Sequence, residues 1–262
     1  MAKPKIVFFD IDDTLYDQNK TVPDSTAEAI HKLQSKGVIT AIATGRAPFM
    51  FRKLRQQLTI HTFVSINGSF VVHEDAPVYT NPIQKPLLKL LVSGAEKQGF
   101  SLAFVNEETM KMHRTASREA IMGIESLKLP LPFPETDPDF YKEHDVYQGL
   151  LFYSEQDNRE FLEQTPLNTL RYVRWHECGV DVIPHNGSKA EGIKQLLKIL
   201  NFTPEDACAF GDGNNDVEML SYVGTGIAMG NAVEAAKKSA DLVTTSVQKD
   251  GIYHGLQQIG LL

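Results

Sequence analysis

The chain holds two acid-rich motifs whose side chains could bind a hard cation. Gly211-Asp-Gly-Asn-Asn-Asp216 offers two carboxylates and two amides as oxygen ligands, and its glycines permit a tight backbone. Asp10-Ile-Asp-Asp-Thr14 places two carboxylates one residue apart, so they point the same way if the chain is extended. Either motif could instead be a solvated turn, because turns are rich in polar residues. The sequence lacks the helix–loop–helix frame and distant glutamate of an EF-hand, which excludes that calcium loop.

Two further motifs hold a hydroxyl group and cationic side chains. Thr44-Gly-Arg46 follows an apolar run, although Thr-Gly is also ordinary turn chemistry and Thr44 could cap the next helix. Gly187-Ser-Lys189 places a lysine at the head of a predicted helix, where the helix dipole makes a cation mildly unfavourable. That lysine indicates an anion nearby, unless it is merely solvated.

The first part of the chain alternates strand and helix. Lys5–Phe9 and Val38–Ala43 are apolar runs that predict buried strands. Between them, residues 24–28 are expected to cap a helix whose apolar residues recur at helical spacing as far as Gly37. Nearly continuous apolar strands joined by a helix indicate a parallel sheet covered on both faces. The fold class is therefore α/β.

The same alternation resumes late in the chain. The sequence predicts a helix over Lys189–Leu200, a strand over Ala207–Phe210, part of a helix over Val217–Leu220 and a strand over Gly226–Met229. These pieces complete a doubly wound, Rossmann-like sheet. All four polar motifs then follow separate strands, and a parallel sheet would gather them at its carboxyl edge, where ligands bind in such folds.

The middle of the chain has a different character. Residues 81–184 are a proline-punctuated mixture of helices and strands, with strand-like runs at Ser101–Val105, Tyr147–Tyr153 and Leu170–Trp175. We expect an inserted α+β domain there, and a core domain formed by residues 1–80 and 185–262.

Composition narrows the class of protein. The chain has 262 residues with 26 basic and 33 acidic side chains, a formal net charge of −7, and it lacks a basic run. This balance argues against nucleic acid and against an anionic membrane as partners. The sequence contains no stretch approaching the roughly 20 apolar residues of a membrane helix. Cys178 and Cys208 lack CxxC spacing, so we expect both to be reduced, in the cytoplasm.

As a set, the motifs resemble those of the haloacid dehalogenase superfamily, and within it of the Cof-type branch. The family's four motifs match DxDxT at Asp10 to Thr14, an apolar strand ending in Thr44, Lys189, and GDxxND at Gly211 to Asp216. The resemblance spans the whole chain, and the insertion is placed like that branch's large cap. Asp13 departs from the family's DxDGT form, which puts only the local backbone geometry in doubt.

The resemblance implies roles for the motif residues. Asp10 is expected to be the nucleophile and Asp12 the general acid and base, which distinguishes phosphatases from dehalogenases. Thr44 and Lys189 would assist as further catalytic groups. The implied cofactor is Mg²⁺, and the expected metal-binding residues are Asp10, Asp12 through its backbone carbonyl, Asp212 and Asp216. The expected phosphate- and substrate-binding residues are Thr44, Gly45, Arg46, Lys189 and Asn215.

Some roles stay open at this point. Asp216 could bind metal through water or orient Lys189, and Asn215 could be a metal ligand or a phosphate contact. Gly213 and Asn214 are expected to shape the loop, because such residues readily adopt left-handed conformations. The cap is expected to set specificity, and its polar or amphipathic candidates, for which a surface or packing role is the stronger interpretation, are Lys111, His113, Arg114, Trp175 and His176.

The predicted function is Mg²⁺-dependent hydrolysis of small phosphorylated metabolites, such as sugar phosphates, through an aspartyl-phosphate intermediate. One alternative is a phosphomutase or phosphotransferase, in which a sugar hydroxyl discharges the intermediate. Another is a non-catalytic sensor, against which the nucleophile and general acid side by side argue. A GxGxxG fingerprint does not follow the first strand, which disfavours a dinucleotide-dependent redox enzyme. The substrate is left open and could be a hexose phosphate, pyridoxal phosphate, flavin mononucleotide or a nucleotide. The metal could also be manganese or cobalt.

Overall fold

The computed structural model describes residues 3–128, 131–157 and 159–262. The chain divides into two compact units. The core unit comprises Met1–Arg46, Phe51–Thr80 and Ser188–Leu262, and the insert unit comprises Ala47–Met50 and Asn81–Gly187. We propose that residues 1–80 together with residues 185–262 fold as one domain, and that residues 81–184 fold as another.

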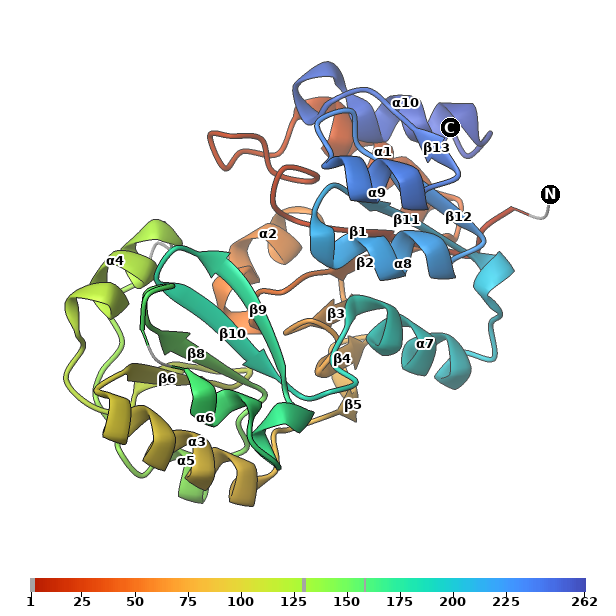
Figure 1. Cartoon of the computed structure of the whole chain (residues 1–262). Helices are drawn as coiled ribbons and strands as arrows, with labels where there is room; N and C mark the ends of the chain where they lie inside the picture. The colour runs from red at the N-terminus through yellow and green to blue at the C-terminus, as the bar shows by residue number, and fades with distance from the viewer. Residues whose placement is uncertain (1–2, 129–130, 158) are drawn as a thin grey trace. The chain divides into compact units, whose positions relative to one another are not determined.

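The described residues of the core unit form an eight-stranded sheet in the order β13-β12-β11-β1-β2-β3-β4-β5 (Figure 1). Neighbouring strands are parallel from β13 to β3, whereas β4 and β5 extend the sheet as antiparallel strands. The strands are β1 Ile6–Phe9, β2 Ile39–Ala43, β3 Thr62–Ser65, β4 Phe70–His73, β5 Ala76–Thr80, β11 Ala207–Gly211, β12 Thr225–Ala228 and β13 Leu242–Val243. The predicted α/β class is confirmed, with a sheet that is mostly rather than wholly parallel.

The register of the central strands explains how the motifs meet. Phe9, at the end of β1, pairs with Ile42 on β2 and with Phe210 on β11. All residues of β1 are buried, and the Phe9 and Phe210 rings stack with their centroids 5.5 Å apart. Both faces of the central strands are thus covered, as their continuous apolar character predicts. The polar residues that follow these strands therefore lie at the same edge of the sheet.

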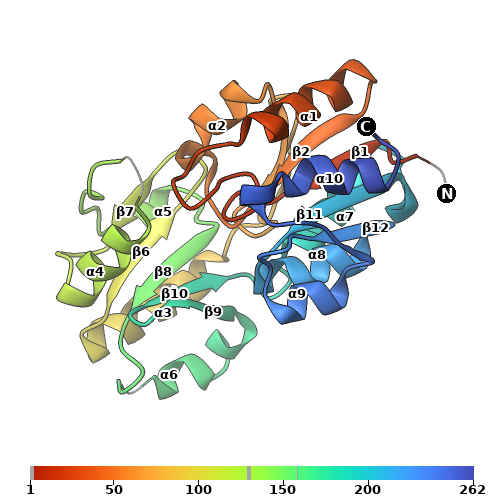
Figure 2. The ribbon, with the colours of Figure 1, turned by 90° about the horizontal axis from the view of Figure 1, so that it is seen from above.

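Helices cover both faces of this sheet (Figures 1 and 2). Helices α1 and α10 lie side by side on one face, and α7 and α8 pack against strands on the other. The helices of the core unit are α1 Asp24–Ser35, α2 Arg52–Gln57, α7 Lys189–Ile199, α8 Val217–Tyr222, α9 Glu234–Ser239 and α10 Gly251–Gln258, with 3₁₀ turns η3 Pro204–Asp206, η4 Asn214–Asp216 and η5 Val247–Lys249.

The expected cap of the first helix is wrong. The N-cap of α1 is Pro23, whose side chain has no hydrogen-bonding atom, and Asp24 is already the first helical residue. The Ser25 hydroxyl instead donates to the Asp250 carboxylate at 2.6 Å. A tertiary contact between the starts of α1 and α10 thus takes the place of a local capping box.

The described residues of the insert unit form a five-stranded antiparallel sheet in the order β7-β6-β8-β10-β9. The strands expected around residues 101–105, 147–153 and 170–175 are present, whereas β7 and β10 were not predicted. The elements are η1 Pro48–Met50, α3 Lys85–Gln98, β6 Ser101–Val105, β7 Met110–Met112, α4 Arg118–Ser126, α5 Phe140–Glu143, β8 Gln148–Phe152, α6 Glu160–Glu163, η2 Leu167–Thr169, β9 Arg171–His176 and β10 Gly179–Ile183.

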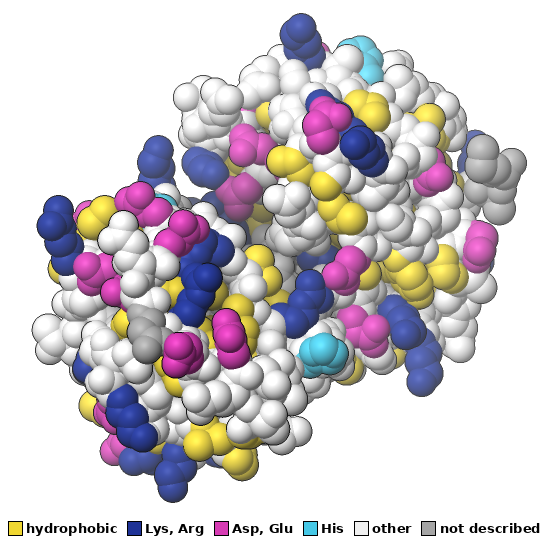
Figure 3. Space-filling view, viewed as in Figure 1, with side chains coloured by type: hydrophobic (Ala, Val, Ile, Leu, Met, Phe, Trp, Pro, Cys, Tyr) yellow, Lys and Arg dark blue, Asp and Glu magenta, His cyan; other side chains and the backbone are white. Residues whose placement is uncertain are grey.

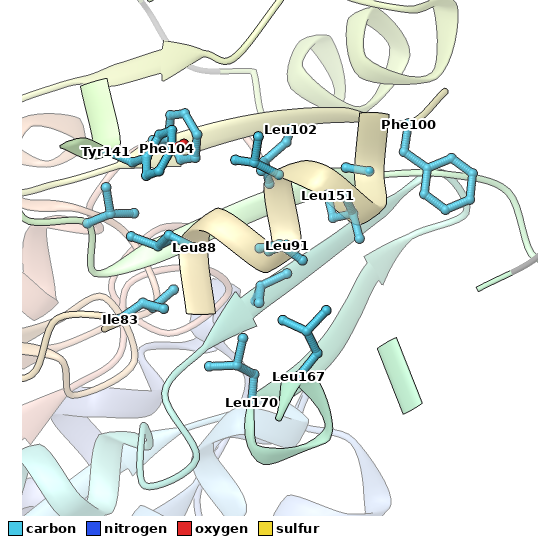
Figure 4. Close-up of a cluster of buried hydrophobic side chains, with 14 of the residues drawn as sticks. Ile83, Leu88, Leu91, Phe100, Leu102, Phe104, Tyr141, Leu151, Leu167 and Leu170 are labelled. Carbon is cyan, nitrogen blue, oxygen red and sulfur yellow. The ribbon is translucent and has the colours of Figure 1, made fainter. Parts of the chain in front are cut away.

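The insert unit has a hydrophobic core of its own. Leu88 and Leu91 of α3 pack into a buried cluster with Leu102, Phe104 and Leu151 of the sheet (Figure 4). Alternate residues of β6 supply this cluster, as expected for a strand with one face toward a helix. The unit therefore buries enough apolar surface to hold its sheet and helix together.

The surface is mixed in charge. Acidic and basic side chains are interspersed on the face of each unit seen in Figure 3. Within residues 3–128, 131–157 and 159–262, no helix has both the length and the apolar character needed to cross a membrane. Cys178 and Cys208 are free thiols, and both are buried.

Candidate active site

The first motif and the last motif meet at the carboxyl edge of the core sheet. Asp10 follows β1, its backbone N–H donates to the carbonyl of Phe210 at 3.0 Å, and its side chain is buried. Asp212 follows β11, the strand that pairs with β1. The parallel register thus brings together two carboxylates that are about 200 positions apart in the sequence.

Lys189 is the first residue of α7 and lies buried between carboxylates. Its Nζ is 2.5 Å from Oδ1 of Asp10 and 2.7 Å from Oδ1 of Asp216. Ser188 is the N-cap of the helix and accepts a hydrogen bond from the Glu191 N–H. A lysine at the head of a helix indicates an anion nearby, and the two carboxylates fulfil that expectation. Burial alone would lower the pKa of Lys189, but Asp10 and Asp216 outweigh it and raise that pKa.

Close packing sets the position of α7. The turn between β3 and β4 contains Gly68 at φ +87°, and a Cβ there would lie 1.9 Å from the carbonyl oxygen of Ser188. A Cβ added to Gly192 of α7 would lie 2.5 Å from Cγ1 of Val64. Two positions without side chains therefore let the start of α7 approach the sheet, which brings Lys189 to Asp10.

Asp216 organises the loop that carries Asp212. Its Oδ2 accepts hydrogen bonds from the backbone N–H groups of Asp212 and Gly213, each at 2.9 Å. A Cβ at Gly211 would lie 2.5 Å from Cγ of Asp216, so the motif needs glycine there. Of the two roles left open for Asp216, its bond to Lys189 supports that of orienting the lysine.

The prediction that Gly213 and Asn214 adopt left-handed conformations is wrong. Gly213 has φ −94°, and Asn214 begins the right-handed 3₁₀ turn η4. The hydrogen bonds from the loop N–H groups to the Asp216 carboxylate fold this segment as a helical turn.

Three carboxylates at this edge could hold one divalent cation. Asp10, Asp212 and Asp216 each offer an oxygen, and these oxygens lie within 4.8 Å of one another. Burial raises the pKa of Asp10 well above its usual value, although Lys189 opposes the rise. Burial and the Asp216 charge raise the pKa of Asp212 to about 7. A bound divalent cation would offset this crowding of negative charge, and carboxylate oxygens are suitable ligands for it.

Thr14 is a site residue whose role the sequence did not reveal. Its hydroxyl donates to Oδ1 of Asp212 at 2.9 Å. The threonine of the first motif therefore fixes the aspartate of the last one. The DxDxT pattern marked Thr14 as part of a motif, but only the sheet register shows its partner.

Asp12 has a different environment from Asp10. Its carboxylate is paired with Arg46, through Nε at 2.8 Å and Nη2 at 2.7 Å, and with Lys20 Nζ at 2.6 Å. Burial would raise the pKa of Asp12, but hydrogen bonds and charge from Arg46 and Lys20 hold it below its usual value. The two carboxylates of the first motif thus have pKa values shifted in opposite directions, and Asp12 is the one whose ionised form is favoured in the substrate-free protein.

Thr44 is buried beyond β2 and belongs to a tight turn. Its Oγ1 accepts the backbone N–H of Arg46 at 3.1 Å, a local turn contact rather than a helix cap. Because the oxygen accepts this bond, the hydroxyl hydrogen can be donated to another group. The backbone of Thr44 bonds to Val64 and to Asn67, so the β3–β4 turn holds the Thr44 loop in place.

Asn67 is a second residue that sequence reasoning missed. It is buried with φ +47°, and its Oδ1 accepts a hydrogen bond from Nδ2 of Asn215 at 3.4 Å. A Cβ on Gly45 would lie 3.1 Å from the same Oδ1, so Gly45 leaves space for this amide. The signal in the sequence was an Asn-Gly pair directly after an apolar run.

The polar candidates of the insert unit have structural partners. Lys111 pairs with Glu135 at 2.5 Å, His113 Nε2 lies 3.0 Å from Glu96, and Arg114 donates to the carbonyl of Phe100. Trp175 packs edge-on against Phe152, and His176 Nδ1 accepts the N–H of Cys178. These contacts support the packing role that the sequence already favoured.

Comparison with known proteins agrees with this geometry. Residues 7–256 match the family model described as haloacid dehalogenase-like hydrolase. YkrA of Bacillus subtilis (strain 168), provisionally named a phosphatase, is 42% identical over 258 residues, which cover 98% of each chain.

Two solved structures are also similar over nearly their whole length. A hypothetical protein from Geobacillus kaustophilus HTA426 is 46% identical, with a TM-score of 0.93 and coverage of 99% of this chain and 100% of that one. The subclass IIB sugar phosphatase BT4131 is 28% identical, with a TM-score of 0.84 and coverage of 98% and 100%. The chain therefore belongs to the haloacid dehalogenase-like hydrolases, as a Cof-type phosphatase of small phosphorylated metabolites.

Proposed function

We propose that this phosphatase is Mg²⁺-dependent and forms an aspartyl-phosphate intermediate on Asp10. The observation that supports this most strongly is the contact of Lys189 with both Asp10 and Asp216, beside the carboxylate of Asp212. A lysine and three carboxylates, gathered at one sheet edge, provide charge for a phosphate, ligands for a cation and a nucleophile.

The carboxylates of Asp10 and Asp212 would hold Mg²⁺, together with the backbone carbonyl of Asp12. Asp216 could contribute through water while it orients Lys189. When bound, Mg²⁺ supplies positive charge that neutralises phosphoryl oxygens and suppresses their repulsion of the nucleophile.

Asp10 would attack the phosphorus atom in line. A bond forms between a carboxylate oxygen and phosphorus while the bond from phosphorus to the leaving oxygen breaks. Lys189 fixes the carboxylate through Oδ1 and places positive charge against the transferred phosphoryl group. The carboxylate is thereby aligned before the substrate arrives.

Asp12 would carry the proton. It protonates the departing alkoxide in the first step and removes a proton from the attacking water in the second. Its pairing with Arg46 holds the carboxylate beside the nucleophile's loop. The proton therefore returns to Asp12 at the end of each turnover.

The phosphoryl oxygens would be bound by donors from three loops. Thr44 would offer its hydroxyl, Lys189 its ammonium group and Asn215 its amide. Gly45 and Arg46 line the same turn, where backbone N–H and guanidinium groups could extend the set.

Sugar phosphates are the substrates to test first, since BT4131 is described as a sugar phosphatase. Phosphate release is measured from an aryl phosphate and a panel of hexose phosphates, with Mg²⁺ or with chelator, for wild type and Asp10→Asn. Magnesium-dependent release that this substitution abolishes supports the proposal. Transfer to an added sugar without free phosphate would instead indicate a phosphotransferase. A folded protein that releases and transfers nothing would contradict the proposal.

A further inference from the structure

Lys20 is a charged residue beside the proposed general acid, and the motifs assign it no role. Its Nζ lies 2.6 Å from Oδ1 of Asp12. Both side chains are 41% exposed, so the pair stands where solvent and a leaving group could reach it. An exposed ion pair contributes little to stability. The contact therefore calls for an explanation other than stability of the fold.

The loop that carries Lys20 is built around Asp17. Oδ1 of Asp17 accepts hydrogen bonds from the backbone N–H groups of Asn19 and Thr21, each at 2.9 Å, and from the Thr21 hydroxyl at 2.8 Å. The Asp17 backbone also bonds to Thr21 and accepts from the N–H of Lys20. These bonds close a compact turn whose geometry Asp17 determines.

The turn holds Lys20 in a conformation that lysine rarely adopts. Its φ is +58°, in the left-handed region that is unfavourable for an L-residue. Surrounding contacts must maintain such a backbone, and local strain of this kind tends to occur at functional positions. In this conformation the side chain reaches Asp12.

The hydrogen bonds distinguish the two oxygens of Asp12. Oδ1 accepts from Nη2 of Arg46 at 2.7 Å and from Nζ of Lys20 at 2.6 Å. Oδ2 accepts from Nε of Arg46 at 2.8 Å. A carboxylate oxygen has about two lone-pair sites. Within the described part of the chain, Oδ1 thus accepts two hydrogen bonds and Oδ2 accepts one.

We propose that Lys20 is a positioning residue that directs Oδ2 of Asp12 toward the leaving group. With Arg46 it occupies Oδ1, so that Oδ2 is the oxygen through which Asp12 gives a proton to the departing alkoxide. Without Lys20, each oxygen would accept one hydrogen bond from Arg46, and the carboxylate could present either oxygen. This inference rests on the proposed role of Asp12 as general acid.

Leaving groups of different acidity test this role directly. The kinetic constant kcat/KM reports the steps up to phosphorylation of Asp10, and only a poor leaving group needs protonation in those steps. We expect Lys20→Met to lower kcat/KM about tenfold for alkyl phosphates but less than about twofold for 4-nitrophenyl phosphate. Lys20→Arg should retain most of the alkyl activity. Asp17→Ala should reproduce the pattern of Lys20→Met, because it removes the turn that places the lysine.

The control variant is Lys97→Met, which removes another exposed lysine and should leave both substrates unaffected. Equal losses on both substrates in Lys20→Met, or no loss on either, would overturn the inference while leaving the proposed function intact. Failure of the wild type to turn over any substrate with Mg²⁺ would remove the proposed function and this inference together.

Discussion

Nζ of Lys189 lies 2.5 Å from Oδ1 of Asp10, although the two residues are far apart in the sequence. The lysine begins a helix and the aspartate ends a strand, so the contact depends on how α7 packs on the sheet. Burial of both groups makes this pair sensitive to any change of charge.

Removing the Lys189 charge should therefore reduce both activity and stability. Lys189→Met leaves the buried Asp10 and Asp216 without their cation, which costs about 3–5 kcal/mol when a buried pair is broken. Denaturant unfolding at pH 7.5 with chelator measures this loss. Lys194→Met, an exposed change on the same helix, is the control. A Lys189→Met protein as stable as that control would contradict the assigned contact.

Stabilisation by Mg²⁺ should increase with pH. The pKa of Asp212 is raised to about 7 from an ordinary 3.8, so the folded metal-free protein binds more protons than the unfolded chain between these values. Stability without metal contributed by this group therefore falls as pH rises from about 4 to 7. Metal binding requires the ionised carboxylates and releases protons.

Thermal unfolding at pH 5 and pH 8, with Mg²⁺ or chelator, measures this coupling. The rise in Tm caused by Mg²⁺ should be larger at pH 8, and Asp212→Asn should abolish most of it. An equal rise at both pH values would show that these carboxylates do not bind the metal.

The insert unit carries its own pH-dependent group. Burial raises the pKa of Asp181 on β10 to about 7, although hydrogen bonding to Gln148 opposes the rise. The folded state again binds the additional proton, so the stability from this group is lost as pH rises through about 7. Asp181→Asn should be more stable than wild type at pH 8, on the order of 2 kcal/mol, and equal to it near pH 4. Denaturant titrations at both pH values measure the difference, and a constant difference would contradict the raised pKa.

Gly192 should resist substitution even though it lies within a helix. Alanine normally stabilises a helix by about 1 kcal/mol relative to glycine. Here the added Cβ would meet Val64 and the backbone of Gly68, so α7 and Lys189 would have to move. Gly192→Ala should lower both Tm and kcat, whereas Lys194→Ala on the exposed side should change neither appreciably. A more stable Gly192→Ala protein with full activity would show that the close packing is unimportant.

Asp13 should be replaceable by glycine. Its φ is +58°, which glycine adopts freely, and its carbonyl accepts a hydrogen bond from Asn231 that glycine would keep. Asp13→Gly should change stability by less than about 1 kcal/mol and retain activity, while Asp13→Val should destabilise by about 1–2 kcal/mol. Tm and kcat of the two variants measure these changes in stability and activity. If the Asp13→Gly and Asp13→Val proteins had equal Tm and kcat, the backbone conformation at this position would not determine which residue it accepts.

The sequence predicted the core strands β1, β2, β11 and β12 and the motifs after them because these depend on local patterns. The apolar runs before Asp10 and Thr44 fixed the sheet edge, and the glycine-rich motif after β11 supplied Asp212. Strands β3, β4, β5 and β13 were missed. β13 has two residues and β5 is partly exposed, so both give a weak periodic signal. The cap at Asp24 failed because a tertiary partner replaced a local one.

Side-chain partners across the sheet were the least predictable part of the site. Thr14 bonds to Asp212 and Asn67 to Asn215, and both contacts join segments far apart in sequence. Lys20 is close to Asp12 in sequence, but the turn that directs it depends on hydrogen bonds to Asp17. Such contacts follow from strand register and backbone conformation, which one sequence does not display.

The proposed mechanism requires that Asp10 becomes phosphorylated during turnover. The most direct measurement is mass spectrometry of acid-quenched Asp12→Asn protein mixed with 4-nitrophenyl phosphate and Mg²⁺. This variant lacks the base that activates water, and its substrate needs no proton on the leaving group. We expect a burst of one nitrophenol per protein and one phosphoryl group on Asp10. Turnover by this variant without a burst, or a phosphoryl group on any other residue, would contradict it.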